Sequence, residues 1–238
     1  MLLDLIFGGF QKHDLIVFLM WIPIILLSLS IHESAHAYIA YKLGDPTARN
    51  FGRCTMNPIS HIDPMGFLSM LIIGFGWAKP VPINSRNFEK PKKGLALSAL
   101  AGPVSNLLLA IIMAFLLAVT ETVYIFALKT MNETLYMVFY YIETFFFYGV
   151  WLNVSLAIFN FLPIPPLDGS KILGLVLPPK VYFKYLQYER YTGIAFAVIV
   201  IVLGYMNISL ISWIVAPVTS WIISTVGMPI FSLLELIM

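Results

Sequence analysis

The chain alternates long apolar stretches with two polar segments that carry most of its charged residues. A helix needs about 20 apolar residues to cross a hydrocarbon core about 30 Å thick. Five stretches approach or exceed that length, at 15–43, 95–119, 134–161, 192–214 and 215–236. The last two are divided only by a possible tight turn at Ala216-Pro217, so they could also form one kinked assembly. The pattern predicts an all-α polytopic membrane protein, a bundle of about five to six transmembrane helices.

Three shorter segments interrupt this pattern. Residues 66–77 are apolar and glycine-rich but too short to span, which suits a re-entrant or interfacial segment or hairpin loop. Residues 169–177 suit a short helix after a proline cluster. Residues 51–55 could offer a strand edge to an extended peptide, or form an ordinary surface turn. No repeat or linker is visible, so we expect residues 1–238 to form a single membrane-embedded domain.

The composition fits membrane embedding and excludes other classes of protein. Hydrophobic residues make up 60% of the chain and charged residues only 11%, which a soluble domain does not show. The net charge of +2 and the lack of a basic, aromatic platform argue against a nucleic acid partner. Cys54 is the single cysteine, so no internal disulfide can form. Residues 1–10 lack a basic region, so we expect no cleaved signal peptide.

The basic residues predict the orientation of the chain. They gather in two loops, at 44–94 and 162–191. These loops hold Arg49, Arg53, Lys79, Arg86, Lys90, Lys92 and Lys93, and Lys171, Lys180, Lys184 and Arg190. On the other face we find only Lys12 and Lys129. Because cytoplasmic loops are enriched in Lys and Arg, we expect both loops in the cytoplasm and the protein in the cell membrane.

The first apolar stretch contains the motif His32-Glu33-Ser34-Ala35-His36. Ionisable side chains are costly at membrane depth, so such a cluster indicates a functional site. Residues four apart share one helix face, so His32 and His36 can bind one zinc ion together. Glu33 would then stand beside the metal as the general base. Two histidines that only hydrogen-bond between packed helices are the alternative.

A catalytic zinc site usually has a third protein ligand, and Asp168 is our candidate. Pro163, Pro165 and Pro166 must end the third apolar helix, since proline lacks an N–H donor and clashes within a helix. Such a break can bring Asp168 toward the histidines, because the orientation places both segments at the cytoplasmic end. The alternative is that Asp168 only caps the short helix that follows.

Together these motifs resemble the site-2 protease family of intramembrane zinc metalloproteases. The resemblance rests on H-E-x-x-H followed by Asn160-Phe161-Leu162-Pro163-Ile164-Pro165-Pro166-Leu167-Asp168-Gly169. Further similar segments are 52–58, 61–66, 76–82 and Ala101-Gly102-Pro103-Val104-Ser105-Asn106. The likeness covers a catalytic core of about 15–177, and the C-terminal helices at about 192–236 are less characteristic. No stretch is long enough for a PDZ or CBS domain, so the chain looks like the compact bacterial form.

The resemblance implies roles for individual residues. His32, His36 and Asp168 would bind one Zn²⁺ per chain, and Glu33 would be the catalytic base. Asn160 would contact the substrate backbone or the developing oxyanion, although an interhelical hydrogen bond would also explain it. Asn106 could pack or hydrogen-bond the active-site helix, while the sequence leaves the roles of His61 and Glu143 open.

We therefore expect an intramembrane zinc endopeptidase whose partners are the lipid bilayer and transmembrane protein substrates. A membrane zinc carrier or sensor without proteolytic activity is the alternative, and an inactive scaffold that binds transmembrane helices is a third. Glu33 discriminates between the first two, because a carrier needs no base beside its ligands.

Overall fold

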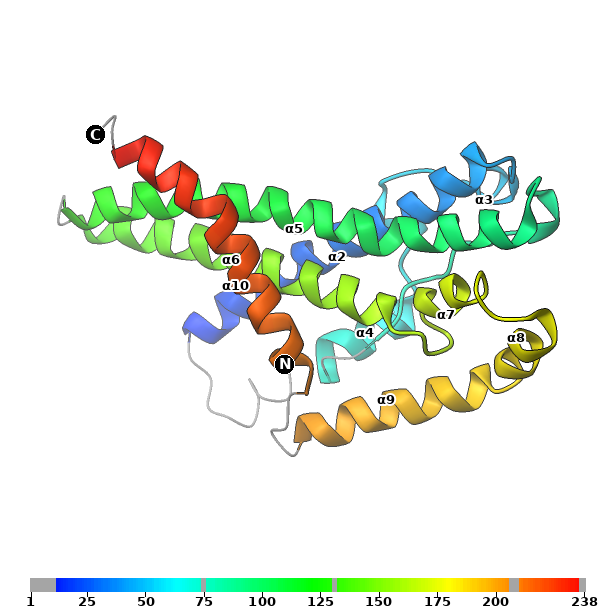
Figure 1. Cartoon of the computed structure of the whole chain (residues 1–238). Helices are drawn as coiled ribbons and strands as arrows, with labels where there is room; N and C mark the ends of the chain where they lie inside the picture. Colours follow the sequence, from blue (N-terminus) through cyan, green and yellow to red (C-terminus); the bar gives the residue numbers. More distant parts are fainter. Residues whose placement is uncertain (1–11, 74–75, 130–131, 206–209, 236–238) are drawn as a thin grey trace.

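The computed structural model describes residues 12–73, 76–129, 132–205 and 210–235 (Figure 1). Within these ranges the chain is helical and contains no strand. The helices are α2 (Lys12–Lys42), α3 (Thr47–Asn50), α4 (Pro64–Ile73), α5 (Pro91–Lys129), α6 (Glu133–Phe161), α7 (Asp168–Leu173), α8 (Pro179–Leu186), α9 (Glu189–Tyr205) and α10 (Leu210–Glu235). Two 3-10 turns lie at Pro58–Ser60 and Ser85–Asn87. The expectation for residues 1–10 lies outside the described residues.

Four helices of the described chain, α2, α5, α6 and α10, are long and apolar enough to cross a membrane. They correspond to the predicted first, second, third and last stretches. Residues 192–205 of the predicted fourth stretch lie in α9, whose apolar part within the described residues is Tyr191–Val200. At 1.5 Å per residue, the 17 described residues of α9 are about 25 Å long.

The predicted turn at Ala216-Pro217 is wrong. Helix α10 begins at Leu210 and continues through both Pro217 and Pro229. Proline is tolerated inside membrane helices because neighbouring helices and local adjustments satisfy the freed carbonyls. Helices α2 and α5 likewise contain Pro23 and Pro103. Proline alone is therefore a weak sign of a helix end in this chain.

The long helices α5 and α6 lie side by side and antiparallel, and α2 and α10 pack against them (Figure 1). The core between α5, α6 and α10 is formed by aliphatic side chains and alanines. It consists of Leu109, Ala110, Met113, Ala114, Val150, Val154, Val215 and Ile222. The buried residues of α2 and α5 include several alanines, among them Ala37, Ala40, Ala96 and Ala99. Small residues let helix backbones approach closely, so α2 is held tightly on α5.

The connection from α2 to α5 contains α3, α4 and two irregular stretches. Of the two alternatives for residues 51–55, the structure has the surface turn and not the strand edge, and Gly52 there has a φ of +68°. Glycine adopts this left-handed conformation without the strain a side chain would cause. The sequence also allowed a hairpin loop at residues 66–77. In the described part of this connection, the structure has a single antiparallel bridge there, between Ile62 and Ala78. Helix α4 occupies the loop that the bridge closes, and at 10 residues it is too short to span, as predicted.

The predicted break after the third apolar stretch lies between α6 and α7. Helix α6 ends at Phe161, and α7 begins at Asp168 after the three prolines. Helices α3, α7 and α8, which belong to the two basic loops, lie at the same end of the bundle (Figure 1). The break therefore returns the chain to the end of α2 that carries the H-E-x-x-H motif.

Candidate metal centre

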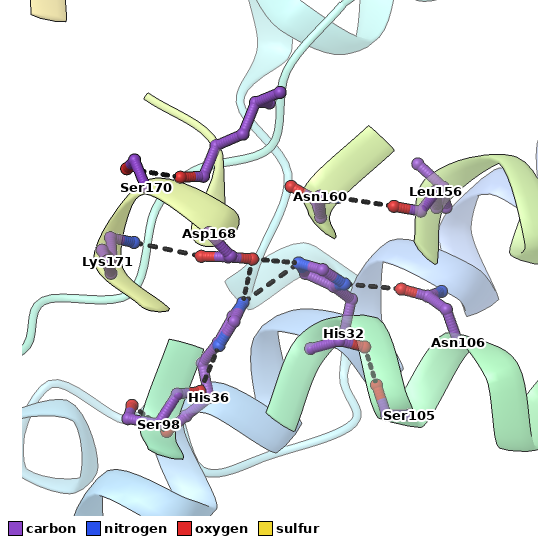
Figure 2. A network of polar contacts seen from close by, with 12 residues as sticks. His32, His36, Ser98, Ser105, Asn106, Leu156, Asn160, Asp168, Ser170 and Lys171 are labelled. Atoms are coloured by element: carbon purple, nitrogen blue, oxygen red, sulfur yellow. Dashed lines mark hydrogen bonds and ion pairs between the residues drawn. The ribbon is translucent and has the colours of Figure 1, made fainter. Parts of the chain in front are cut away.

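His32 and His36 lie one turn apart on α2 and face the interior of the bundle (Figure 2). Their exposed fractions are 5% and 6%. Helical geometry accounts for the pairing, because side chains at i and i+4 lie above one another on one face. Their Nε2 atoms are 3.0 Å apart. Two nitrogen donors therefore converge on one point, at a depth where imidazoles need partners.

Asp168 reaches this point from the other side of the helix break. Gly169 makes the approach possible: a Cβ there would lie less than 3.0 Å from the Phe161 and Leu162 carbonyl oxygens, so only glycine lets α7 pack on the end of α6. The Asp168 carboxylate is 5% exposed. It turns to the histidines and to Lys171 instead of capping α7, and this disfavours the capping alternative.

The distances within this trio suit a metal ion. Asp168 Oδ2 lies 3.2 Å from His32 Nε2 and 3.0 Å from His36 Nε2. In a tetrahedral zinc site with bonds of 2.0–2.1 Å, ligand atoms are about 3.3 Å apart. Two imidazole nitrogens and one carboxylate oxygen form a donor set that zinc accepts, with a fourth position left for water. The three residues therefore fit zinc in chemistry and in spacing.

The far nitrogen of each imidazole is fixed by an acceptor (Figure 2). His36 Nδ1 lies 2.7 Å from the Ser98 carbonyl oxygen, which can only accept a hydrogen bond. His32 Nδ1 lies 2.5 Å from Asn106 Oδ1. Both rings must therefore carry their proton on Nδ1, which leaves the Nε2 lone pairs directed at the shared point. Such partners fix the tautomer and orientation of metal-binding histidines.

Lys171 completes the surroundings of Asp168. Its Nζ lies 3.1 Å from Oδ1, the carboxylate oxygen that does not face the histidines. Burial by itself raises the pKa of Asp168. The close contacts of the carboxylate with His32 and His36 and the Lys171 charge outweigh burial and hold that pKa below its usual range. Asp168 is therefore an anion, and its Oδ2 faces the two imidazole nitrogens.

The two predicted catalytic residues lie near this trio but outside it. Glu33 follows His32 on α2, is half-buried, and is close enough for an electrostatic interaction with that imidazole. Asn160 lies near the end of α6, one residue before the break (Figure 2). Its Nδ2 donates to the Leu156 carbonyl at 2.9 Å, within its own helix, and not across to another helix as the alternative assumed. A side-chain amide carries a second N–H, which this bond does not use.

His61 is buried in the loop that covers the motif. Its Nε2 donates to the Thr55 carbonyl at 2.7 Å, and the Ser34 hydroxyl binds the same carbonyl. The loop is thereby tied to α2 inside the H-E-x-x-H motif. His61 Nδ1 has no hydrogen-bond partner among the described residues. This geometry makes His61 a structural link between loop and motif, and it leaves one nitrogen for a further partner.

Several contacts of the site escaped the sequence analysis. Asn153, Ser28 and Lys171 were not singled out, although Asn153 is fully buried in an apolar helix. A polar residue inside a membrane helix is the signal that could have identified it. The Ser98 carbonyl gives no such signal, because every residue carries one.

Comparisons with known proteins agree on one family. Residues 20–206 match the profile described as Peptidase family M50. Two relatives are named "Putative zinc metalloprotease", as YwhC in Bacillus subtilis and as Rip2 in Mycolicibacterium smegmatis. YwhC is 45% identical over 74% of this chain and 77% of its own length. Rip2 is 29% identical over 89% of this chain and 79% of its own length. No solved structure matches the chain.

Proposed function

The chain belongs to peptidase family M50 and is a multi-pass membrane zinc metalloprotease, and from this premise we propose that it hydrolyses peptide bonds in or near transmembrane segments of other proteins. The observation that carries the proposal is the convergence of His32, His36 and Asp168 within 3.2 Å of one another inside the bundle. A protease whose metal ligands are buried between apolar helices suits substrates that enter from the bilayer.

In this proposal the three residues bind one zinc ion per chain. Bound zinc would supply Lewis-acid polarisation of the scissile carbonyl and lower the pKa of water toward neutrality. The donor set supports zinc because the ligand atoms are two nitrogens and one carboxylate oxygen with suitable spacing. The Ser98 carbonyl and Asn106 keep both imidazoles in the tautomer that presents Nε2.

Glu33 is the general base in this mechanism. It accepts a proton from the attacking water and later delivers that proton to the leaving amine, which balances the hydrolysis. Its half-buried position beside His32 supports the role. Asn160 donates its second amide N–H to the carbonyl oxygen as negative charge develops there. Its place next to the helix break that carries Asp168 supports this assignment.

We also propose that the site opens toward the cytoplasm and that the protein lies in the cell membrane. Both basic loops lie at the end of the bundle that holds the metal centre (Figure 1). Cytoplasmic loops carry an excess of Lys and Arg, which supports this orientation. Water would then reach Glu33 from the side of the polar connection between α2 and α5.

The test is cleavage of a fluorogenic transmembrane peptide by the purified protein in liposomes. We expect cleavage that stops when a zinc chelator is added and returns with zinc. A matched His36→Ala variant should be inactive under all three conditions. Cleavage that continues in a protein shown to be free of metal would overturn the zinc mechanism.

The zinc carrier remains the alternative, and the same liposomes test it. A carrier would move zinc into liposomes that contain a zinc-sensitive dye, whereas a protease would cleave the peptide without transport. Uptake of zinc without cleavage of any transmembrane peptide would favour the carrier.

A further inference from the structure

A chain of hydrogen bonds leads from the His32 imidazole away from the metal centre, across α5 to α6. His32 Nδ1 lies 2.5 Å from Asn106 Oδ1, as Figure 2 shows. Asn106 Nδ2 donates to Asn153 Oδ1 at 2.8 Å. Asn153 Nδ2 then donates to the Gly149 carbonyl oxygen, also at 2.8 Å. Both asparagines are 0% exposed, so this series of hydrogen bonds is buried inside the bundle.

The last acceptor determines the direction of every bond in this chain. The Gly149 carbonyl can only accept, so the NH₂ group of Asn153 must face it. The second hydrogen of that NH₂ group is taken by the Ser28 hydroxyl, at 2.9 Å. The Asn153 oxygen is thereby turned toward α5, where it can only accept a hydrogen bond from Asn106.

Asn106 is oriented by this acceptor. One hydrogen of its amide is bound to Asn153 Oδ1, and the Ser28 carbonyl oxygen lies 3.4 Å from the same nitrogen. Its own oxygen therefore faces His32 and must accept a hydrogen bond from the Nδ1–H group of that ring. An amide turned the other way would place an N–H against His32 Nδ1 and bring two oxygens together at Asn153.

The location in the membrane prevents these hydrogen bonds from reversing their direction. Ser28 lies in the middle of α2 and is 0% exposed. A buried polar group there cannot replace a lost protein partner with solvent. His36 needs no such chain, because its Nδ1 is bound directly to the Ser98 backbone carbonyl. Of the two histidines of the candidate metal centre, His32 is the one whose tautomer depends on side chains.

We propose that Asn153 is a positioning residue for the metal centre: through Asn106 it holds His32 with the proton on Nδ1 and the Nε2 lone pair toward zinc. The proposal rests on zinc binding by His32, which belongs to the proposed function. Asn153 touches neither substrate nor zinc and acts only through Asn106. Partners of this kind typically change metal affinity by 10–100-fold when removed.

The test compares the zinc affinity of Asn153→Leu with that of Val154→Ala, measured by competition with a chelator in detergent. Asn153→Leu keeps the size of the side chain and removes the amide. Val154→Ala removes buried volume at the next position of α6 and leaves the hydrogen bonds intact. We expect about a 10–100-fold loss of affinity for Asn153→Leu and less than about a twofold loss for the control. Equal affinities of the two variants would overturn the proposal.

A second comparison distinguishes positioning from a general loss of packing. Asn106→Ala should weaken zinc binding, and adding Asn153→Ala to it should cause no further loss, because the link is already broken. Additive losses would mean that Asn153 acts by another route. Since Asn153→Ala adds no bulk, it also replaces Asn153→Leu if that variant does not fold.

The tautomer itself can be measured in metal-free protein. The chain has only four histidines, so ring ¹⁵N signals can be assigned by single substitutions. We expect His32 protonated on Nδ1 in the wild type and a mixture of tautomers in Asn153→Ala. The same tautomer in both proteins would overturn the proposal. Wild-type protein that binds no zinc would instead contradict the proposed function.

Discussion

Gly102 of α5 lies directly against His36 of α2, so closely that no side chain fits between them. A Cβ placed on Gly102 would come within 3.0 Å of His36 Nε2 and of His32 Cε1, a separation that real Cβ atoms essentially never show. Gly102 therefore lies directly beneath both imidazoles of the candidate metal centre. The glycine allows α5 to support both imidazoles without pushing them out of line.

We expect Gly102→Ala to displace the imidazoles and lower cleavage of the transmembrane peptide by about 100-fold, because catalytic groups tolerate little misplacement. The kinetic constants of the purified variant in liposomes are the measurement. Gly227→Ala in α10 is the control, since a Cβ there meets its neighbours at 3.5 Å or more. A Gly102→Ala variant as active as Gly227→Ala would show that the close approach of Gly102 to the imidazoles has no role in activity.

Glu33→Gln should keep zinc and lose activity. The amide has nearly the shape of the carboxylate but cannot accept the proton of water, and loss of a general base costs about 10²–10⁴-fold. Zinc content and cleavage are measured on the same preparation. A zinc-loaded Glu33→Gln variant that still cleaves would remove Glu33 from the mechanism.

Lys171→Met should make zinc binding more sensitive to acid. The Lys171 charge helps to hold the pKa of Asp168 below its usual range, so its removal lets that pKa rise. A carboxylate must be deprotonated to bind zinc, so the variant should lose zinc at a higher pH than the wild type. Zinc affinity measured across a pH series checks this shift. Lys171→Arg keeps the charge and should follow the wild type.

Asp45 should make the loop after α2 sensitive to acid. Burial raises the pKa of Asp45, but hydrogen bonds from Thr47, Asn87 and Asn84 outweigh burial and lower it from 3.8. A lowered pKa in the folded state stabilises the fold above the ordinary pKa, and this stabilisation is lost as the pH falls below about 3.8. We expect Asp45→Asn to lower stability at neutral pH by about 1–3 kcal/mol.

Thermal unfolding at pH 7 and at acidic pH measures this effect. The difference between Asp45→Asn and wild type should shrink as the pH falls through the pKa of the carboxylate. Asp14→Asn, at an exposed carboxylate, is the control and should change little. A difference that stays constant with pH would mean that the charge of Asp45 does not stabilise the loop.

The sequence predicted the elements that the bilayer dictates. A membrane helix must be long and apolar, and three prolines must end α6, so α2, α5, α6 and the break before Asp168 could be recognised. The ends of α10 could not be recognised from the sequence, because neighbouring helices decide whether Pro217 is tolerated. The sequence also could not decide between a turn and a strand edge at residues 51–55, since short loop segments carry little periodicity.

The candidate site was predictable where its residues share one helix turn or follow a strong helix breaker. The spacing of His32 and His36 specifies a common face, whatever the rest of the fold. Asn153 depends instead on how α6 is rotated against α5, which no local pattern reports. Its link to Asn106 could therefore be found only once the helices were packed.

The most direct test of the central claim is the zinc content of detergent-purified protein, wild type beside Asp168→Ala, measured by elemental analysis after reconstitution with zinc. We predict close to one zinc per wild-type chain and a clear drop in the variant, since Asp168 supplies the only carboxylate oxygen of the trio. Zinc that persists unchanged without Asp168, or a wild type that binds none, would contradict the three-residue metal centre.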